Sequence, residues 1–374
     1  MKKMQWVTAM AAAALFAGML TGCGQEQAPD TTAAETAAPE SVNETESAEQ
    51  SETEQQSGEQ AAEPEITFSL SWAPAYDEQH GLTQAALQAD AKIKELSGGR
   101  IGFEFFPGGQ LGGEREVFES VQLGTIDATF ISSPVVSGFT DALDGFDMPY
   151  LCDNDMDLYQ EIVNSGIGEE MFEVLNQETG VVGLAYLINP GRDFYLNTEF
   201  NSLEDAQGVK LRSMESPIQM ETFEALGFSP TPMAYSEIYQ AMQNGTIDGF
   251  EDVSVSVRSQ KNYEVAKHVV ISGHTTAAPV FIVSQNVWNS LTEEEQGWMK
   301  EAGMAAQEAT KETYARETPL TYEFMEEQGL TVTTLDISQA QELVQPVIEK
   351  YCAQSENIKK VVDYFNNYRE EHGL

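Results

Sequence analysis

The chain has 374 residues, with 61 acidic and 19 basic side chains and a formal net charge of −42. Because it lacks a basic surface, nucleic acid and anionic lipid headgroups are excluded as electrostatic partners. Most of the acids are expected to form a solvated surface, and the part from Ile66 onward is long enough for two domains of ordinary size.

Residues 1–22 are predicted to be a lipoprotein signal peptide. Two lysines precede an apolar run at 7–20, which is too short to span a bilayer comfortably but suits a signal-peptide core. The run ends in LTGC, which resembles the bacterial lipobox and implies lipidation of Cys23. An ordinary secretory peptide with an incidental cysteine is the alternative. The lipobox reading places the protein at the outer face of the cytoplasmic membrane, on the periplasmic side if the cell has two membranes.

Residues 23–65 are predicted to be the lipidated cysteine and a disordered acidic tether. Residues 25–65 contain 12 acids, no base and no aromatic residue, so they cannot bury enough apolar surface to fold. A flexible chain of this length has a mean reach of about 35 Å. Such a tether suits a domain that stands off a membrane and must still find a partner there.

The rest of the chain alternates predicted strands with predicted helices. Strands are expected at 66–72, 100–106, 126–132, 181–188, 208–212 and near Ile247, and helices at 79–97, 114–123, 217–226, 236–244 and about 292–317. This alternation indicates an α/β protein with largely parallel sheets. The pattern restarts at Val181, which favours a second α/β unit, and the last helix is long enough to brace two lobes.

Two arginines stand out in so acidic a chain. Arg192 follows an apolar run in a short polar segment, and Arg212 ends a predicted strand. Ligands of open α/β sheets bind at the carboxyl ends of strands, and the planar arginine fork holds a carboxylate with two parallel hydrogen bonds. The sequence therefore predicts a site for a small organic anion.

Five short motifs carry a family resemblance through their joint order. They are PGGQLGGER at 107–115, DMPYL at 147–151, KLR at 210–212, TPMAYSEIY at 231–239 and GTIDGFE at 245–251. Together they resemble the solute-binding proteins of TRAP transporters, the DctP family, over essentially all of 66–374. Any one of these motifs alone is weak.

The resemblance implies a two-lobed fold like that of type II periplasmic binding proteins, with a long helix bracing both lobes. One lobe is expected to contain 66–189 and 278–317, and the other 190–277 and 318–374. The ligand would bind in the cleft between them.

The resemblance also implies particular ligand contacts. Arg212 would pair with the ligand carboxylate, Arg192 would be the second arginine, and Tyr235 would pack on the ligand. The relatives' contact positions further include Glu114, Ser71, Ser132 and His274. A salt bridge of Arg212 to Glu251 or Asp252 between lobes, a core role for Tyr235 and a structural role for His274 remain alternatives.

Asp252 departs from the family pattern, which usually has asparagine there. A carboxylate at this position would repel a second ligand carboxylate and accept hydrogen bonds from hydroxyl groups. This difference favours a sugar acid, such as a uronate or aldonate, over a C4-dicarboxylate.

The resemblance implies an extracytoplasmic receptor that delivers its organic acid to a TRAP permease for ion-coupled import, with no catalysis, no cofactor and no metal site, as a monomer. A C4-dicarboxylate receptor and a sensory lipoprotein presenting its ligand to a receptor kinase remain alternatives. A secreted hydrolase is disfavoured, because the chain has no G-x-S-x-G, H-E-x-x-H or P-loop spacing.

The two remaining cysteines, Cys152 and Cys352, could pair in an oxidising compartment. Cys152 follows Tyr150 and Leu151, and it is expected to be a packed apolar residue rather than a disulfide partner.

Overall fold

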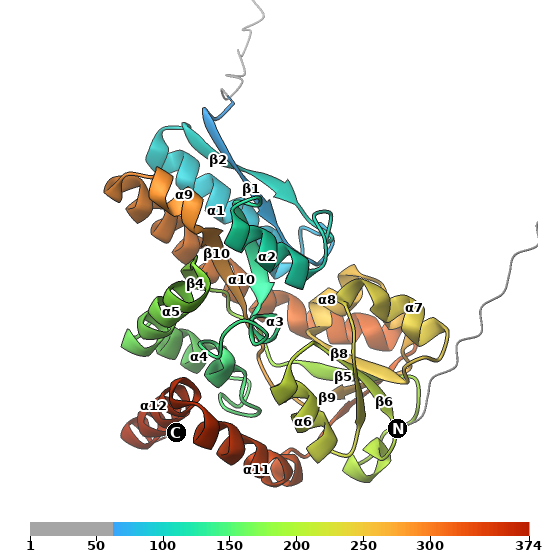
Figure 1. The fold of residues 1–374 in the computed structure, drawn as a ribbon. Coiled ribbons are helices and arrows are strands. Elements are labelled where there is room, and N and C mark those ends of the chain that lie inside the picture. The colour runs from blue at the N-terminus through green and yellow to red at the C-terminus, as the bar shows by residue number, and fades with distance from the viewer. Residues whose placement is uncertain (1–62, 374) are drawn as a thin grey trace, which may run out of the picture. The chain divides into compact units, whose positions relative to one another are not determined.

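The computed structural model describes residues 63–373, which contain two β-sheets with helices packed against them (Figure 1). The predicted signal peptide, the predicted lipidation site Cys23 and the tether as far as residue 62 lie outside the described residues.

The first sheet, sheet A, has five strands in the order β2-β1-β3-β10-β4. Its strands are β1 (Ile66–Ser71), β2 (Ile101–Phe106), β3 (Ala128–Ser132), β4 (Val181–Tyr186) and β10 (Pro279–Ser284). Its helices are α1 (Gly81–Ser97), α2 (Glu114–Leu123), α3 (Ser133–Val136), α4 (Met156–Val163), α5 (Gly166–Thr179) and α9 (Gln285–Ser290), with the 3-10 turn η1 (Asp144–Asp147). Sheet A and these elements are called the first lobe.

The second sheet, sheet B, has six strands in the order β11-β9-β5-β8-β6-β7. Its strands are β5 (Asp193–Leu196), β6 (Lys210–Ser213), β7 (Ser229–Pro232), β8 (Gly249–Asp252), β9 (His268–Ile271) and β11 (Thr331–Thr334). Its helices are α6 (Pro217–Ala225), α7 (Ile238–Gln243) and α8 (Ser254–Ser259), with the 3-10 turns η2 (Leu203–Ala206), η3 (Tyr235–Glu237) and η4 (Asn262–Val265). Sheet B and these elements are called the second lobe.

The expectation of largely parallel sheets is wrong for two strands. β10 runs antiparallel to β3 and β4, and β5 runs antiparallel to β8 and β9. In both cases the chain enters the sheet directly from the other sheet, through 187–192 or 272–278. No crossover helix precedes these strands, so the rule that makes successive βαβ strands parallel does not apply to them.

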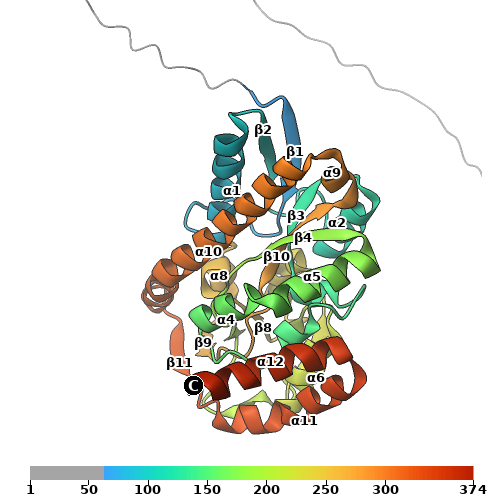
Figure 2. The same ribbon diagram turned by 90° about the vertical axis from the view of Figure 1, so that its left-hand side faces the viewer.

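The predicted long helix is confirmed as α10 (Glu293–Glu327), which ends ten residues beyond the expected end near 317. A capping box of Thr292 and Glu295 starts it, and it continues through Pro319 because Thr321 and Met325 remain buried on its inner face. Helix α10 packs on α1 and β4 of the first lobe and on α8 and β11 of the second, and Figure 2 shows it running along both. It braces the two lobes as predicted.

The C-terminal helices require a different division from the expected one. Helix α11 (Ser338–Gln354) packs on α6 of the second lobe, as the expected boundaries imply. Helix α12 (Glu356–His372) instead packs on η1 and α5 of the first lobe. Its apolar face joins the core of that lobe, where Phe365 is fully buried beside Phe146 (their ring centroids lie 6.4 Å apart).

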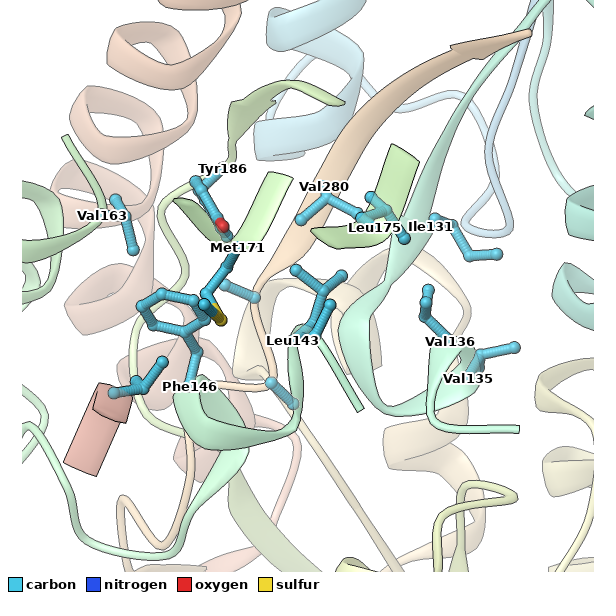
Figure 3. Packing of buried hydrophobic residues seen from close by; sticks show 14 of the residues in the cluster. Ile131, Val135, Val136, Leu143, Phe146, Val163, Met171, Leu175, Tyr186 and Val280 are labelled. Atoms are coloured by element: carbon cyan, nitrogen blue, oxygen red, sulfur yellow. The ribbon is translucent and has the colours of Figure 1, made fainter. Parts of the chain in front are cut away.

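The core of the first lobe gathers side chains from η1, from strands β3, β4 and β10, and from helices α3, α4 and α5 (Figure 3). Phe146 contacts Tyr186, with 5.1 Å between the ring centroids, and Met171 and Leu175 of α5 are completely buried in the same cluster. This packing holds the segment that leads from β4 into the second lobe.

Cys152 is buried in this cluster as predicted, and Cys352 packs against it. Both are free thiols, so the disulfide alternative is not formed in the structure. Within residues 63–373, no helix has both the length and the apolar character needed to cross a membrane.

Candidate functional site

Residues at or just beyond the carboxyl ends of strands from both sheets line one cavity of about 40 Å³. Pro74 follows β1 and Ser132 ends β3 on one side, and Arg212 of β6 and Asp252 of β8 face them from the other. This is the position at which open α/β sheets bind ligands.

A wider outer space of about 570 Å³ shares walls with this cavity. The two spaces have Ala73, Glu114, Arg212, Met214 and Tyr235 in common. The glycine-rich turn of the PGGQLGGER motif forms part of the wall of this outer space. In this turn Gly108, Gly109 and Gly112 have φ of +69°, +66° and +121°, which is a backbone conformation that glycine adopts easily and that would be strained in a residue with a side chain. The outer space is therefore a vestibule to the inner cavity.

Arg192 is held by carboxylates of its own lobe. Its guanidinium binds Glu251 through Nε, and Nη2 donates to Glu251 Oε1 at 3.1 Å and to the Glu251 carbonyl at 3.0 Å. Its Nη1 lies 3.1 Å from Asp252 Oδ1. Burial alone would lower the pKa of Arg192, but the charges of Glu251 and Asp252 raise it above the usual value. Arg192 is thus a permanent cation whose donors are largely occupied.

Arg212 is far less satisfied. Its Nε donates to the Met233 carbonyl at 3.1 Å, and its Nη1 lies 3.6 Å from Glu251 Oε1, beyond hydrogen-bonding distance. Nη1 is buried and has no hydrogen-bond partner among the described residues. Burial lowers the pKa of Arg212, Glu251 raises it and the neighbouring Arg192 lowers it again, so the net shift is downward. The structure therefore keeps a desolvated cation with a free donor at the wall of the cavity.

Glu251 is the centre of the charge network, whereas the sequence suggested it only as an alternative salt-bridge partner of Arg212. It is fully buried between the two arginines, and His274 Nε2 lies 3.7 Å from Glu251 Oε2. Burial would raise the pKa of Glu251, but Arg192 and His274 lower it to about 2. Because β6 and β8 are neighbours in sheet B, a salt bridge between Arg212 and this carboxylate lies within one lobe, not between lobes as the alternative supposed.

Asp252 and Tyr235 form a pair on the cavity wall. The Tyr235 hydroxyl donates to Asp252 Oδ2 at 2.8 Å, and Oδ1 of the same carboxylate accepts from the Val253 N–H at 2.8 Å. Burial raises the pKa of Asp252, and the Arg192 charge opposes that rise. The Arg212 guanidinium lies 6.0 Å from the centre of the Tyr235 ring. Tyr235 thus lines the cavity and also packs in the core of the second lobe.

The other predicted contacts divide into two groups. Glu114 and Ser132 line the cavity together, and the Ser132 N–H donates to Glu114 Oε1 at 2.8 Å. Ser71 lies behind the wall, where it donates to Thr129 Oγ1 at 3.0 Å. His274 is completely buried behind Glu251 and stacks on Phe194 with 4.4 Å between the ring centroids. The structure does not bring Ser71 or His274 into the cavity.

Asn189 was missed by sequence reasoning. It lies in the segment that joins the lobes, lines the cavity, and has a buried side-chain oxygen without a hydrogen-bond partner among residues 63–373. Its sequence signal is one polar residue directly after the apolar run 181–188. The site therefore offers both an unpartnered donor, on Arg212, and an unpartnered acceptor.

Metal ligation is not supported in this part of the chain. Residues 63–373 contain no group of three or more His, Cys, Asp or Glu side chains arranged to hold a metal ion.

Comparison with known proteins agrees with this architecture. The family model of the bacterial extracellular solute-binding proteins, family 7 (DctP), matches residues 73–355. A TRAP periplasmic solute-binding protein from Pseudomonas putida F1, solved with bound D-glucuronate, is 27% identical with a TM-score of 0.75, over 80% of this chain and 97% of that one. One from Xanthobacter autotrophicus Py2, with bound β-D-galacturonate, is 27% identical with a TM-score of 0.74, over 80% and 98%.

A periplasmic protein named for a different ligand is also similar. The C4-dicarboxylate-binding periplasmic protein DctP of Rhodobacter capsulatus is 28% identical over 278 residues, which cover 71% of this chain and 81% of that protein. The relatives described above are named for two ligand classes, uronates and C4-dicarboxylates. The side chains that line the cavity are the basis for choosing between these classes.

Proposed function

Since the chain belongs to the DctP family of bacterial extracellular solute-binding proteins, we propose that it binds a sugar acid, such as a uronate or aldonate, between its lobes. It then delivers this ligand to a TRAP permease for ion-coupled import. The observation that carries the proposal is the buried, unpartnered Nη1 of Arg212 at the cavity wall. A ligand carboxylate would supply the missing acceptor in a charge-assisted hydrogen bond.

The charges around the cavity favour a ligand with one carboxylate. Arg192 and Arg212 face Glu251 and Asp252, so these four charges cancel. One ligand carboxylate can pair with Arg212, but a second would meet the carboxylates of Asp252 or Glu114 without a free cation. Hydroxyl groups suit the same surfaces, because Asp252, Glu114 and the Asn189 oxygen accept hydrogen bonds.

The protein is extracytoplasmic, as its family is. We propose that Cys23 anchors it through lipid and that it acts as a monomer, with no cofactor and no catalytic step. The LTGC sequence supports the anchor. Incorporation of labelled palmitate that persists in Cys23→Ser would refute the anchor.

A thermal-shift screen of the folded part, from Ile66 onward, tests the ligand class. At about 100 times its dissociation constant a ligand adds about 2.7 kcal/mol of stability, a shift of about 4 °C in Tm at this size. We expect shifts with glucuronate, galacturonate or gluconate and none with succinate or malate. Shifts with the dicarboxylates alone would assign the C4-dicarboxylate class, and no shift with any organic acid would reject the proposal.

Asp252→Asn is expected to move specificity toward dicarboxylates. The change removes a negative charge from the cavity and frees Nη1 of Arg192, which could then pair with a second carboxylate. Calorimetric titration should show malate binding at least about tenfold tighter than in the wild type and uronate binding about tenfold weaker, the scale of one hydrogen bond to a charged group.

Asp248→Asn is the matched control for that substitution. Asp248 pairs with Lys210 on the outside of the same lobe, at 3.7 Å, and lies away from the cavity. The Asp248→Asn variant should bind malate and uronate with the affinities of the wild type. Unchanged malate affinity in Asp252→Asn would show that Asp252 does not select the ligand class.

A further inference from the structure

His80 joins the two lobes at the edge of the ligand cavity. It precedes helix α1 of the first lobe, and its ring Nε2 lies 2.8 Å from Oγ of Ser256 in helix α8 of the second lobe. His80 is completely buried, and Ser256, which is 4% exposed, lines the cavity. None of the predicted ligand contacts includes either residue.

The hydrogen bonds of the ring define its tautomer. The backbone N–H of Leu82 donates to His80 Nδ1 at 3.1 Å, so Nδ1 carries a lone pair and caps the start of α1. In the neutral ring the proton is then on Nε2, which donates to Ser256 Oγ. The hydroxyl proton of Ser256 is consequently left for donation to another acceptor.

The surroundings keep the ring neutral. Burial and the positive charge of Arg258, two residues after Ser256 on α8, lower the pKa of His80 to about 3. The edge of Tyr314, from the bracing helix α10, contacts the ring at 5.7 Å between centroids. The same tautomer therefore persists over the neutral pH range, and so does the direction of its hydrogen bond.

We propose that His80 is a positioning residue of the binding site: it orients the Ser256 hydroxyl as a donor to the bound sugar acid, and this contact holds the two lobes together. The inference rests on the proposed function for its ligand. A carboxylate or ring oxygen of the ligand supplies the acceptor for the Ser256 proton. Binding and closure are thereby coupled through one hydrogen bond.

The test uses three variants of the chain and calorimetric titration with D-glucuronate and D-galacturonate. His80→Asn keeps an N-cap acceptor for Leu82 but is too short to reach Ser256, so α1 should remain folded. Ser256→Ala removes the donor itself, and the third variant combines both changes. Ser259→Ala, on the same helix but absent from the cavity wall, is the matched control.

We expect each single variant to bind about tenfold more weakly than the wild type, the value of one hydrogen bond, with the control unchanged. The double variant should bind no more weakly than Ser256→Ala, because both changes remove one interaction. Wild-type affinity in His80→Asn, or losses that multiply in the double variant, would overturn the inference.

Small-angle scattering of the ligand-free protein separates this inference from the proposed function. A wild type that binds neither sugar acid contradicts the function, but the lobe contact is still measurable. His80→Asn should then have a larger radius of gyration than the wild type, since a contact between the lobes is lost. An unchanged radius would reject the lobe contact whatever the ligand.

Discussion

Arg212→Ala abolishes sugar-acid binding in our expectation and leaves the ligand-free protein at least as stable as the wild type. The guanidinium is buried, has an unpartnered Nη1 and has a lowered pKa, so the fold bears its desolvation without full compensation. Truncating one member of a buried ion pair typically costs about 2–5 kcal/mol of binding, so affinity should fall at least about 30-fold. Calorimetry and thermal unfolding of the same sample measure both effects.

Arg212→Lys is the matched variant for the geometry of the fork. Lysine keeps a positive charge but cannot hold a carboxylate with two parallel donors. We expect affinity between those of the wild type and the alanine variant. If Arg212→Ala binds within about threefold of the wild type, the anchor lies elsewhere, and Arg192 is the first candidate.

Glu251→Gln should be the most destabilising single change in the site. It leaves Arg192 and Arg212 buried side by side without the carboxylate between them, a situation that typically costs about 3–5 kcal/mol. Chemical denaturation of the ligand-free protein at neutral pH measures the loss. Glu237→Gln, at the exposed rim of the vestibule, is the control and should unfold like the wild type.

The stability that Glu251 contributes should depend on pH, because only its ionised form pairs with the two arginines. The folded-state pKa of Glu251 is about 2, below the 4.5 of an unperturbed glutamate, so its ionised form stabilises the fold by about 3 kcal/mol above pH 4.5. This contribution is lost as pH falls from about 4.5 to about 2. The stability difference between wild type and Glu251→Gln should shrink over the same interval. A difference that stays constant down to pH 2 would contradict the ion-pair explanation.

Local sequence signals predicted β1 to β4 and the helices α1 and α2 of the first lobe, but not its helices α3, α4, α5 and α9. Helix α2 begins at Glu114 and ends before Gly124, where the sequence indicated, because a left-handed glycine cap is a strong local signal. The short strands β5, β7, β9 and β11 were not predicted, and neither was β10. Strands of four to six residues that pair with partners distant in the sequence show no periodicity that distinguishes them from loops.

The packing of α12 on the first lobe could not be predicted either. Its amphipathic face indicates only that it is buried against something. Helix α12 packs on η1 because the two surfaces are complementary, although they are more than 200 positions apart in the sequence. Gly145 of η1 has no side chain and so leaves room for Val361 of α12. The local pattern of apolar residues does not show which distant element a helix packs against.

For the site, the sequence placed both arginines near the ligand but could not show how their charges are shared. The two residues differ in what occupies their donors: Arg192 has Glu251 and Asp252, and Arg212 has one backbone carbonyl and an unpartnered Nη1. Such distinctions depend on side-chain distances within sheet B. The same holds for Asn189, which only the folded chain brings to the cavity, and for the contact of His80 with Ser256.

The mutual cancellation of the four charges around Glu251 has a kinetic consequence. The cavity offers an approaching anion no net positive field, and the chain around it carries a formal charge of −42. The ligand is therefore repelled over long distances and attracted only once it reaches Arg212. Added salt screens the repulsion more than the buried contact, so the association rate constant should increase with ionic strength while the dissociation rate changes little.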